Sequence, residues 1–202
     1  MRSAAEWSQF ATWAEALGAP LTALQVEQFA AYQKLLLAWN ERMNLTAVRQ
    51  PIDIRIRHFL DSLICVQVTG DLDGRSLVDV GTGAGFPGLP LKILFPGLRL
   101  TLVESVAKKC QFLQAVVAEL GLSEVNILSE RAELLGQQRQ HRQQYDWVVA
   151  RAVAELRILV EYLLPLCRVG GHLLAQKGES IHQELTDAAN AIALLGGEVL
   201  SL

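Results

Sequence analysis

Over the first seventy residues, apolar residues recur every three or four positions, the period of an amphipathic α-helix. This spacing predicts one helix over Ala4–Leu17, ended by Gly18, and a second over Leu21–Trp39. A third should begin at Pro51, whose missing N–H a first helical turn does not use, and run to about Val68. The aromatic residues of the first two helices are best explained as one packed face.

From Ser76 onward, short runs of β-forming residues alternate with longer runs of helical period. Strands are expected at Ser76–Val80, Leu98–Glu104, Val125–Ser129, Trp147–Arg151, His172–Gln176 and Glu198–Leu202. Connecting helices are expected at Pro87–Leu94, Val106–Leu120, Ala154–Cys167 and Ile181–Leu195. The predicted fold class is therefore α/β, a mostly parallel sheet with helices on both faces.

The change of pattern divides the chain into two parts. We expect an N-terminal helical segment, residues 1–70, packed on an α/β domain, residues 71–202, with Asp71–Arg75 as the joint. A length of 202 residues suits one such domain with a small appendage. The chain stops at Leu202 inside the sixth expected strand, which would leave the fifth strand without an outer neighbour.

Composition narrows the class of protein. Half of the residues are hydrophobic, so a full core is expected and disorder is not. The three cysteines are far apart and form no CxxC pair, which argues against a zinc site or disulfides and suits a reducing compartment. The first ten residues lack a signal-peptide core, and the apolar stretch 158–175 is interrupted by charges. We expect a cytoplasmic protein with no metal and no membrane partner.

The net charge of −3 does not indicate a nucleic-acid partner, so any such partner would have to meet a local basic patch. The candidates for that patch precede the α/β domain: Arg42, Arg49, Arg55 and Arg57. A solvated helix face explains the same arginines equally well.

The most informative segment is the glycine loop, Asp79-Val80-Gly81-Thr82-Gly83-Ala84-Gly85-Phe86-Pro87-Gly88. It follows a predicted strand and precedes a helix, where ligands bind at the carboxyl edge of a parallel sheet. Glycines such as Gly81, Gly83 and Gly85 allow a ligand to lie close to the backbone. Glu104, at the tip of the next strand, could accept hydrogen bonds from both hydroxyls of a ribose.

Two cofactors share this arrangement. Gly83-x-Gly85-x-x-Gly88 matches a dinucleotide fingerprint by spacing, but the first glycine after the strand is Gly81, so the register is poor. Asp79 would repel a pyrophosphate, whereas it can pair with the ammonium of a methionine moiety. The charge thus favours S-adenosyl-L-methionine over a nicotinamide dinucleotide. A glycine turn that only packs a strand on a helix remains the alternative without a ligand.

A further triplet, Arg131-Ala132-Glu133, follows the third strand, where an adenine edge would lie. Backbone groups of Ala132 and Glu133 could bracket the base. The first turn of an ordinary helix, where the dipole favours glutamate, explains the triplet equally well.

With these residues the chain resembles the RsmG (GidB) family of 16S rRNA guanine-N7 methyltransferases, from the N-terminal helices to about Ser180. The resemblance rests on Asn40-x-x-x-Asn44-Leu45-Thr46, Arg57-His58-Phe59-x-Asp61-Ser62, the Asp79–Gly88 loop, Val103-Glu104-Ser105, Arg131-Ala132-Glu133, Arg151-Ala152 and Lys177-Gly178.

The resemblance implies a Rossmann-like class I methyltransferase that uses S-adenosyl-L-methionine to methylate one guanine N7. Its partner would be 16S rRNA or the small-subunit ribosomal particle, and we expect a monomer. By analogy the cofactor pocket is lined by Asp79, Gly81, Gly83, Phe86, Glu104, Ala132, Glu133 and Arg151. The residues placed around the target nucleotide are Asn44, His58, Arg131 and Lys177.

Guanine N7 carries a lone pair and no proton, so its methylation needs no general base. The absence of an Asn/Asp-Pro-Pro-Tyr element after the fourth strand agrees with this, and Arg151 stands there instead. Arg151 and Lys177 are candidate donors to guanine O6, although Arg151 could simply pair with Glu104 or Asp79. A structural role is favoured for His58 over that of an acid or base. Asp61 lies near it by helical spacing and could hold its imidazole in place.

Three other functions stay open on the sequence alone. The same pocket could serve a methyltransferase that acts on protein or on a small molecule. The Gly83–Gly88 spacing could belong to a nicotinamide-dependent oxidoreductase. A non-catalytic RNA-binding or assembly protein could also have kept the fold.

Overall fold

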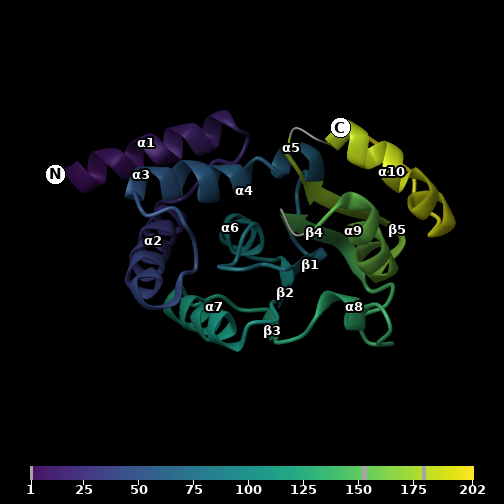
Figure 1. The fold of residues 1–202 in the computed structure, drawn as a ribbon. Helices are drawn as coiled ribbons and strands as arrows, with labels where there is room; N and C mark the ends of the chain where they lie inside the picture. The colour runs from purple at the N-terminus through teal and green to yellow at the C-terminus, as the bar shows by residue number, and fades with distance from the viewer. Residues whose placement is uncertain (1, 152–153, 179–180) are drawn as a thin grey trace.

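The computed structural model describes residues 2–151, 154–178 and 181–202 (Figure 1). Its five-stranded sheet has the order β3-β2-β1-β4-β5, and all neighbouring strands are parallel. The strands are β1 Ser76–Val80, β2 Arg99–Val103, β3 Val125–Leu128, β4 Tyr145–Arg151 and β5 Cys167–Gln176. The α/β fold with a parallel sheet is therefore confirmed.

The helices follow the predicted order. Before the sheet come α1 Arg2–Ala16, α2 Ala23–Met43, α3 Pro51–Ile54, the π-helix η1 Arg55–Leu60, α4 Asp61–Leu63 and α5 Val66–Thr69. Within the α/β part come α6 Gly88–Leu94, α7 Ala107–Glu119, α8 Ala132–Leu135, α9 Leu156–Leu163, the 3-10 turn η2 Leu164–Leu166 and α10 Ile181–Leu194. No helix in these described ranges is both long and apolar enough to cross a membrane.

Helix α2 shows how local sequence fixes a boundary. Thr22 forms a capping box with Gln25, in which each side chain bonds the other's backbone N–H at the helix start. The helix ends at Asn44, which takes the left-handed conformation with φ 49°. It is thus four residues longer at its C-terminal end than the predicted Leu21–Trp39.

Several predicted elements differ from the structure. Strand β5 begins at Cys167, five residues before the predicted His172, so the helix before it ends earlier than predicted, and the short helix α8 is not among the expected helices. The third helix is not regular, because the π-helix Arg55–Leu60 interrupts it. The sixth strand, Glu198–Leu202, is wrong: these residues follow Gly196 and Gly197 as irregular, exposed chain. Their apolar side chains have β propensity, but a strand forms only where another strand offers its backbone groups.

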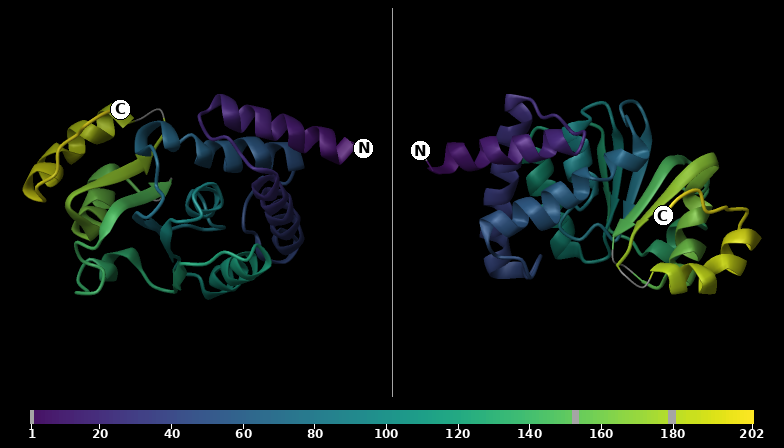
Figure 2. Two further views of the ribbon diagram at one scale, coloured as in Figure 1. Left: turned by 180° about the vertical axis from the view of Figure 1, so that it is seen from behind. Right: turned by 90° about the horizontal axis from the view of Figure 1, so that it is seen from above.

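Alternating residues of each strand face opposite sides of the sheet, and each side has its own core. Leu77 and Val149 face a core that includes residues of α1 and α2, whereas Val78 and Val148 face residues of α9 and α10. Seen from above, the sheet lies between the N-terminal helices and the pair α9–α10 (Figure 2). Residues 2–69 therefore pack on one face of the sheet and share its core.

Candidate functional site

The glycine loop leaves β1 at the carboxyl edge of the sheet, as predicted. The N–H groups of Gly81 and Thr82 donate to the carbonyl of Val103, at 2.9 and 3.1 Å, which ties the loop to the end of β2. Gly83 has φ +62°, and a side chain built there would meet nothing within 4 Å. Gly83 therefore borders open space, where a ligand can approach the backbone.

Gly85 has a different environment. A Cβ at this position would lie 2.4 Å from Leu89 Cδ1 and 2.6 Å from the Tyr32 hydroxyl. The sequence placed Gly85 in the cofactor pocket, but the structure places its α-carbon against the core. It is required there for close packing of the loop.

Asp79 lies beneath the loop and is fully buried. Its Oδ2 accepts hydrogen bonds from Thr82 Oγ1 at 2.7 Å and from the Gly88 N–H at 2.8 Å. Its Oδ1 is buried and has no hydrogen-bond partner. Burial raises the pKa of this carboxyl to about 6. An unpartnered buried carboxylate oxygen is costly, so a cationic ligand group beside it would be strongly favoured.

Glu104 follows β2 and faces the same loop. Its Oε2 accepts from the Gly83 N–H at 3.1 Å, and its Oε1 accepts from the Val106 N–H at 2.9 Å. Lys109 Nζ lies 3.7 Å from Oε2. Each carboxylate oxygen has lone pairs left to accept from a ligand hydroxyl. The two acids and the open backbone at Gly83 therefore suit a ligand that carries an ammonium group and a ribose.

Phe86 lies inside an aromatic stack and is only 4% exposed. The His58 ring stacks on it with centroids 4.6 Å apart, and the Tyr32 ring does so at 5.5 Å. The Arg151 guanidinium lies 5.1 Å from the centre of the Phe86 ring. Phe86 thus joins the glycine loop to the N-terminal helices.

His58 is held by hydrogen bonds at both ring nitrogens. Nε2 lies 2.8 Å from Thr46 Oγ1, and Nδ1 lies 3.1 Å from the Arg57 carbonyl oxygen. The side-chain amide of Asn40 holds the backbone of Thr46: it donates to the Thr46 carbonyl and accepts from the Thr46 N–H, both at 2.9 Å. Burial, with the charge of Arg151, lowers the pKa of His58 to about 4, so the ring is neutral at pH 7. The expectation that Asp61 holds this imidazole is wrong, because Thr46 does.

Asp61 instead pairs with Arg151. Arg151 Nη1 donates to Asp61 Oδ2 at 3.0 Å and to the Arg57 carbonyl at 3.4 Å, so the suggested pairing with Glu104 or Asp79 is replaced. Both contacts come from the π-helix or the residue after it, which fits the association of such segments with functional sites. The end of β4 is therefore joined to η1 and to the first residue of α4.

The other predicted site residues lie farther apart. Asn44 is exposed at the end of α2. Arg131 is 74% exposed and pairs with Glu133 at 3.5 Å, while Ala132 begins the short helix α8. Lys177 is largely buried, and its Nζ lies 2.7 Å from Glu184 Oε2 and 2.5 Å from the Ala154 carbonyl oxygen.

Arg131 follows β3 and Lys177 follows β5, which are the two outer strands of the sheet. Four strand spacings, about 19 Å, separate these strands. Phe86 contacts both His58 and Arg151, whereas Arg131 and Lys177 follow the two outer strands on opposite sides of this cluster.

The basic patch is smaller than the sequence indicated. Arg55 is 3% exposed, pairs with Glu6 at 3.2 Å and lies over the Trp7 ring at 5.2 Å. Arg42, Arg49 and Arg57 remain exposed. In the described part of the chain, no group of three or more His, Cys, Asp or Glu side chains could hold a metal ion.

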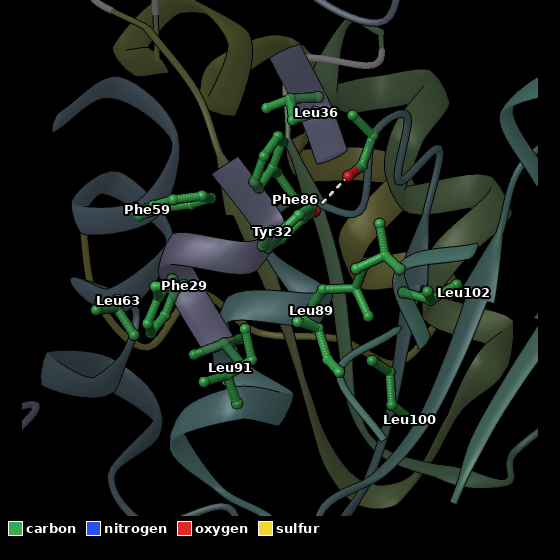
Figure 3. Packing of buried hydrophobic residues seen from close by; sticks show 14 of the residues in the cluster. Phe29, Tyr32, Leu36, Phe59, Leu63, Phe86, Leu89, Leu91, Leu100 and Leu102 are labelled. Carbon is green, nitrogen blue, oxygen red and sulfur yellow. Dashed lines mark hydrogen bonds between the residues drawn. The ribbon is translucent and has the colours of Figure 1, made fainter. Parts of the chain in front are cut away.

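Sequence reasoning missed Tyr32. Its hydroxyl donates to the carbonyl of Ala84 in the glycine loop (Figure 3). The helical period assigns Tyr32 only to the packed aromatic face of the first two helices. The available signal was its phenol, because a buried tyrosine hydroxyl normally has a hydrogen-bond partner.

Comparison with known proteins agrees with this geometry. Residues 25–202 match the family model GidB, described as rRNA small subunit methyltransferase G. The chain is 56% identical over 185 residues to ribosomal RNA small subunit methyltransferase G of Roseiflexus castenholzii, covering 92% of this chain and 79% of that one. It is 51% identical to the same-named protein of Alkaliphilus metalliredigens, covering 87% and 74%.

Solved structures share the fold at low identity. A SAM-dependent methyltransferase from Aquifex aeolicus superposes with a TM-score of 0.52 at 20% identity, over 67% of this chain and 81% of that one. A precorrin-6y C5,15-methyltransferase from Geobacter metallireducens gives 0.51 at 13% identity, over 67% and 70%.

Proposed function

The chain belongs to the GidB family of rRNA small subunit methyltransferases, and from this premise we propose that it methylates N7 of a guanine in a loop of 16S rRNA. The methyl donor is S-adenosyl-L-methionine. The observation that carries the proposal is the glycine loop set between two acids, with the buried Asp79 Oδ1 left without a partner.

The cofactor fits the groups that this edge of the sheet presents. Asp79 Oδ1 would accept from the ammonium group of the methionine part, and Glu104 would accept from the ribose hydroxyls. Ala132 and Glu133, at the start of α8 beyond β3, would border the adenine. When bound, the cofactor supplies a methyl group on a positively charged sulfur, which is a strong electrophile.

The side chains at this edge suit an acceptor that has no proton to lose. Both ring nitrogens of His58 are engaged and its pKa of about 4 makes it a weak base. Asp61 is paired with Arg151. In the part of the chain described, neither is a free general base, and N7 needs none. What the protein must do is orient the base, and orientation can supply roughly 7–11 kcal/mol of a barrier.

Arg151 and Lys177 are our candidates for orienting the guanine through O6. One Nη of Arg151 is used by Asp61 and Arg57, which leaves further guanidinium N–H groups for the base. Lys177 has two acceptors already, so one of its three ammonium hydrogens remains. Asn44, His58 and Arg131 would complete the surroundings of the nucleotide.

The target guanine should be unpaired or splayed out of its helix. A-form RNA hides N7 in a deep, narrow groove that side chains do not reach. The exposed Arg42, Arg49 and Arg57 would contact phosphates, so RNA binding should weaken steeply as salt is raised. A salt-independent affinity would contradict this part of the proposal. We further propose that the protein works in the cytoplasm, as a monomer.

The first test is calorimetric titration with S-adenosylmethionine and with NAD in parallel. We expect binding of the first alone. Binding of NAD, or of neither, would overturn the cofactor assignment. Methyl-labelled cofactor is then offered with naked 16S rRNA, with small ribosomal subunits and with a metabolite mixture.

Label is expected in rRNA, at a position that borohydride and aniline cleave, since these reagents act at N7-methylguanosine. Label in rRNA without cleavage would refute N7 as the acceptor atom. Label in metabolites alone would refute the rRNA substrate. Wild-type rates with both Arg151→Ala and Lys177→Ala would remove these two residues from the proposal.

A further inference from the structure

Helix α2 lies outside the α/β part of the chain, yet it reaches the glycine loop through one side chain. Tyr32 is fully buried, and its hydroxyl donates to the carbonyl of Ala84, which is itself in the loop. The same hydroxyl would lie 2.6 Å from a Cβ at Gly85, so it is in contact with the loop backbone. The contact is therefore made to main chain at two successive loop residues.

The ring of Tyr32 is held on several sides. Its centroid lies 5.2 Å from that of Phe59, 5.5 Å from that of Phe86 and 6.4 Å from that of Phe112. Phe59 belongs to η1, Phe86 to the glycine loop and Phe112 to α7. Because the ring has no room to move, the position of its hydroxyl is fixed.

Helix α2 is itself fastened to the helices on either side of the loop. Gln25 Nε2 donates to the carbonyls of Ile93 and Leu94, at 2.8 and 2.9 Å, at the end of α6. Gln28 Nε2 donates to the carbonyl of Leu120 at 2.9 Å, just after α7. Helix α6 follows the glycine loop and α7 follows Glu104, so α2 is bonded to the ends of the two helices that come after the proposed cofactor groups.

We propose that Tyr32 is a positioning residue of the cofactor site, through which the N-terminal helical segment fixes the backbone of the glycine loop. The inference rests on the proposed cofactor. Without the phenol, the Ala84 carbonyl lacks its donor, and the loop gains freedom to turn that carbonyl toward water. Cofactor binding must then reorder the loop, which weakens affinity.

The test is Tyr32→Phe, which keeps the ring and removes only the hydroxyl. Losing one buried hydrogen bond corresponds to about a 2- to 13-fold change in an equilibrium constant, and we expect the Kd for S-adenosylmethionine to rise by this factor. In steady-state assays KM for the cofactor should rise likewise, with kcat and KM for rRNA near the wild-type values.

Tyr145→Phe is the matched control. Tyr145 is also buried, and its hydroxyl lies 2.8 Å from His141 Nδ1, but it begins β4 at the opposite edge of the sheet. Both variants lose one hydroxyl and should lose similar stability. Only Tyr32→Phe should weaken cofactor binding, and only it should speed amide hydrogen exchange at Gly85 and Phe86.

An unchanged Kd in Tyr32→Phe, or an equal rise in both variants, would overturn the inference. If wild-type protein bound no S-adenosylmethionine, the proposed function would fail instead, so the two failures are distinguishable. Should Tyr32→Phe not fold, Gln28→Leu removes the bond of α2 to the end of α7. We expect it to raise the Kd about twofold, and no rise there would overturn the inference.

Discussion

Replacing Asp79 by asparagine should raise stability slightly or leave it unchanged while cofactor binding falls sharply. The carboxyl of Asp79 has a pKa of about 6 in the folded protein, against an ordinary value of 3.8, because burial disfavours its charge. A difference of about two pKa units corresponds to roughly 3 kcal/mol. Since the folded pKa is the higher one, this group favours folding below pH 3.8. That advantage is lost as the pH rises through 6, so at pH 7 the folded wild type is destabilised by the full cost of burying the ionised carboxylate.

Asparagine removes the charge and keeps the shape. Its oxygen can accept from Thr82 and Gly88 as Oδ2 does, and its NH₂ then takes the place of the unpartnered Oδ1. An unsatisfied buried group costs about 1–3 kcal/mol. Subtracting this from roughly 3 kcal/mol gives Asp79→Asn an advantage of about 0–2 kcal/mol at pH 7.

The effect on ligand binding has the opposite sign. A hydrogen bond to a charged group is worth about 1.5–3 kcal/mol, so the Kd for S-adenosylmethionine should rise roughly 10- to 150-fold. For the wild type, affinity should also fall as the pH drops below 6, because the carboxyl must be ionised to bind an ammonium group. The variant should lack this pH dependence.

Urea unfolding at several pH values, with calorimetry on the same samples, tests the reasoning. The stability of the variant relative to the wild type should decline from pH 7 to pH 4. Asp146→Asn is the control with the opposite sign. Burial alone would raise the pKa of Asp146, but hydrogen bonds from Ser76 and Arg168 lower this pKa to about 2. That variant should lose stability at pH 7 and keep its cofactor affinity. A pH-independent loss of stability in Asp79→Asn, or an unchanged Kd, would refute the argument.

Three further substitutions probe the same site. Asp61→Asn frees Arg151 and should lower kcat about tenfold, with a loss of stability below about 1 kcal/mol because the pair is partly exposed. Gly85→Ala places a Cβ within 2.6 Å of neighbouring side chains at φ +98°, and thermal unfolding should show a loss of about 1–3 kcal/mol. Lys177→Met removes one hydrogen-bonded partner of the Glu184 carboxylate, which also accepts from the Leu156 N–H, and urea unfolding should show a loss of about 1–3 kcal/mol.

Each of these has a control. Asp61→Glu should restore much of kcat, and full activity in Asp61→Asn would show that Arg151 needs no such partner. Gly83 borders open space, so Gly83→Ala should lower stability less than Gly85→Ala does. It should weaken cofactor binding more. If Lys177→Met kept full stability, the buried pair would not hold α10 in place.

Much of the site was accessible from the sequence because its signals are local. Strands β1 and β2 are short, largely apolar runs bounded by turns, and the acids Asp79 and Glu104 lie at their ends, where parallel strands present ligand-binding groups. Position along the chain was therefore enough to predict the edge of the sheet, the glycine loop and both acids.

The remaining features depend on contacts that no local pattern encodes. Arg151 and Asp61 are ninety residues apart, and several carboxylates could have served as the partner. The hydroxyl of Tyr32 lies on a face that a helical period describes only as apolar. The run Glu198–Leu202 has strand-like composition, but strand formation depends on a neighbouring strand and not on the run itself.

The π-helix at Arg55–Leu60 has an evolutionary consequence. Each residue of an α-helix advances the chain by about 100°, so deleting one residue here would rotate everything that follows by about that angle. Asp61 comes directly after this segment and would turn away from Arg151. Substitutions in the interval from Pro51 to Asp61 are therefore compatible with the Arg151–Asp61 pair, but a change in the number of residues in this interval is not. Relatives that keep the pair should show neither insertion nor deletion in this interval, even where their sequences differ.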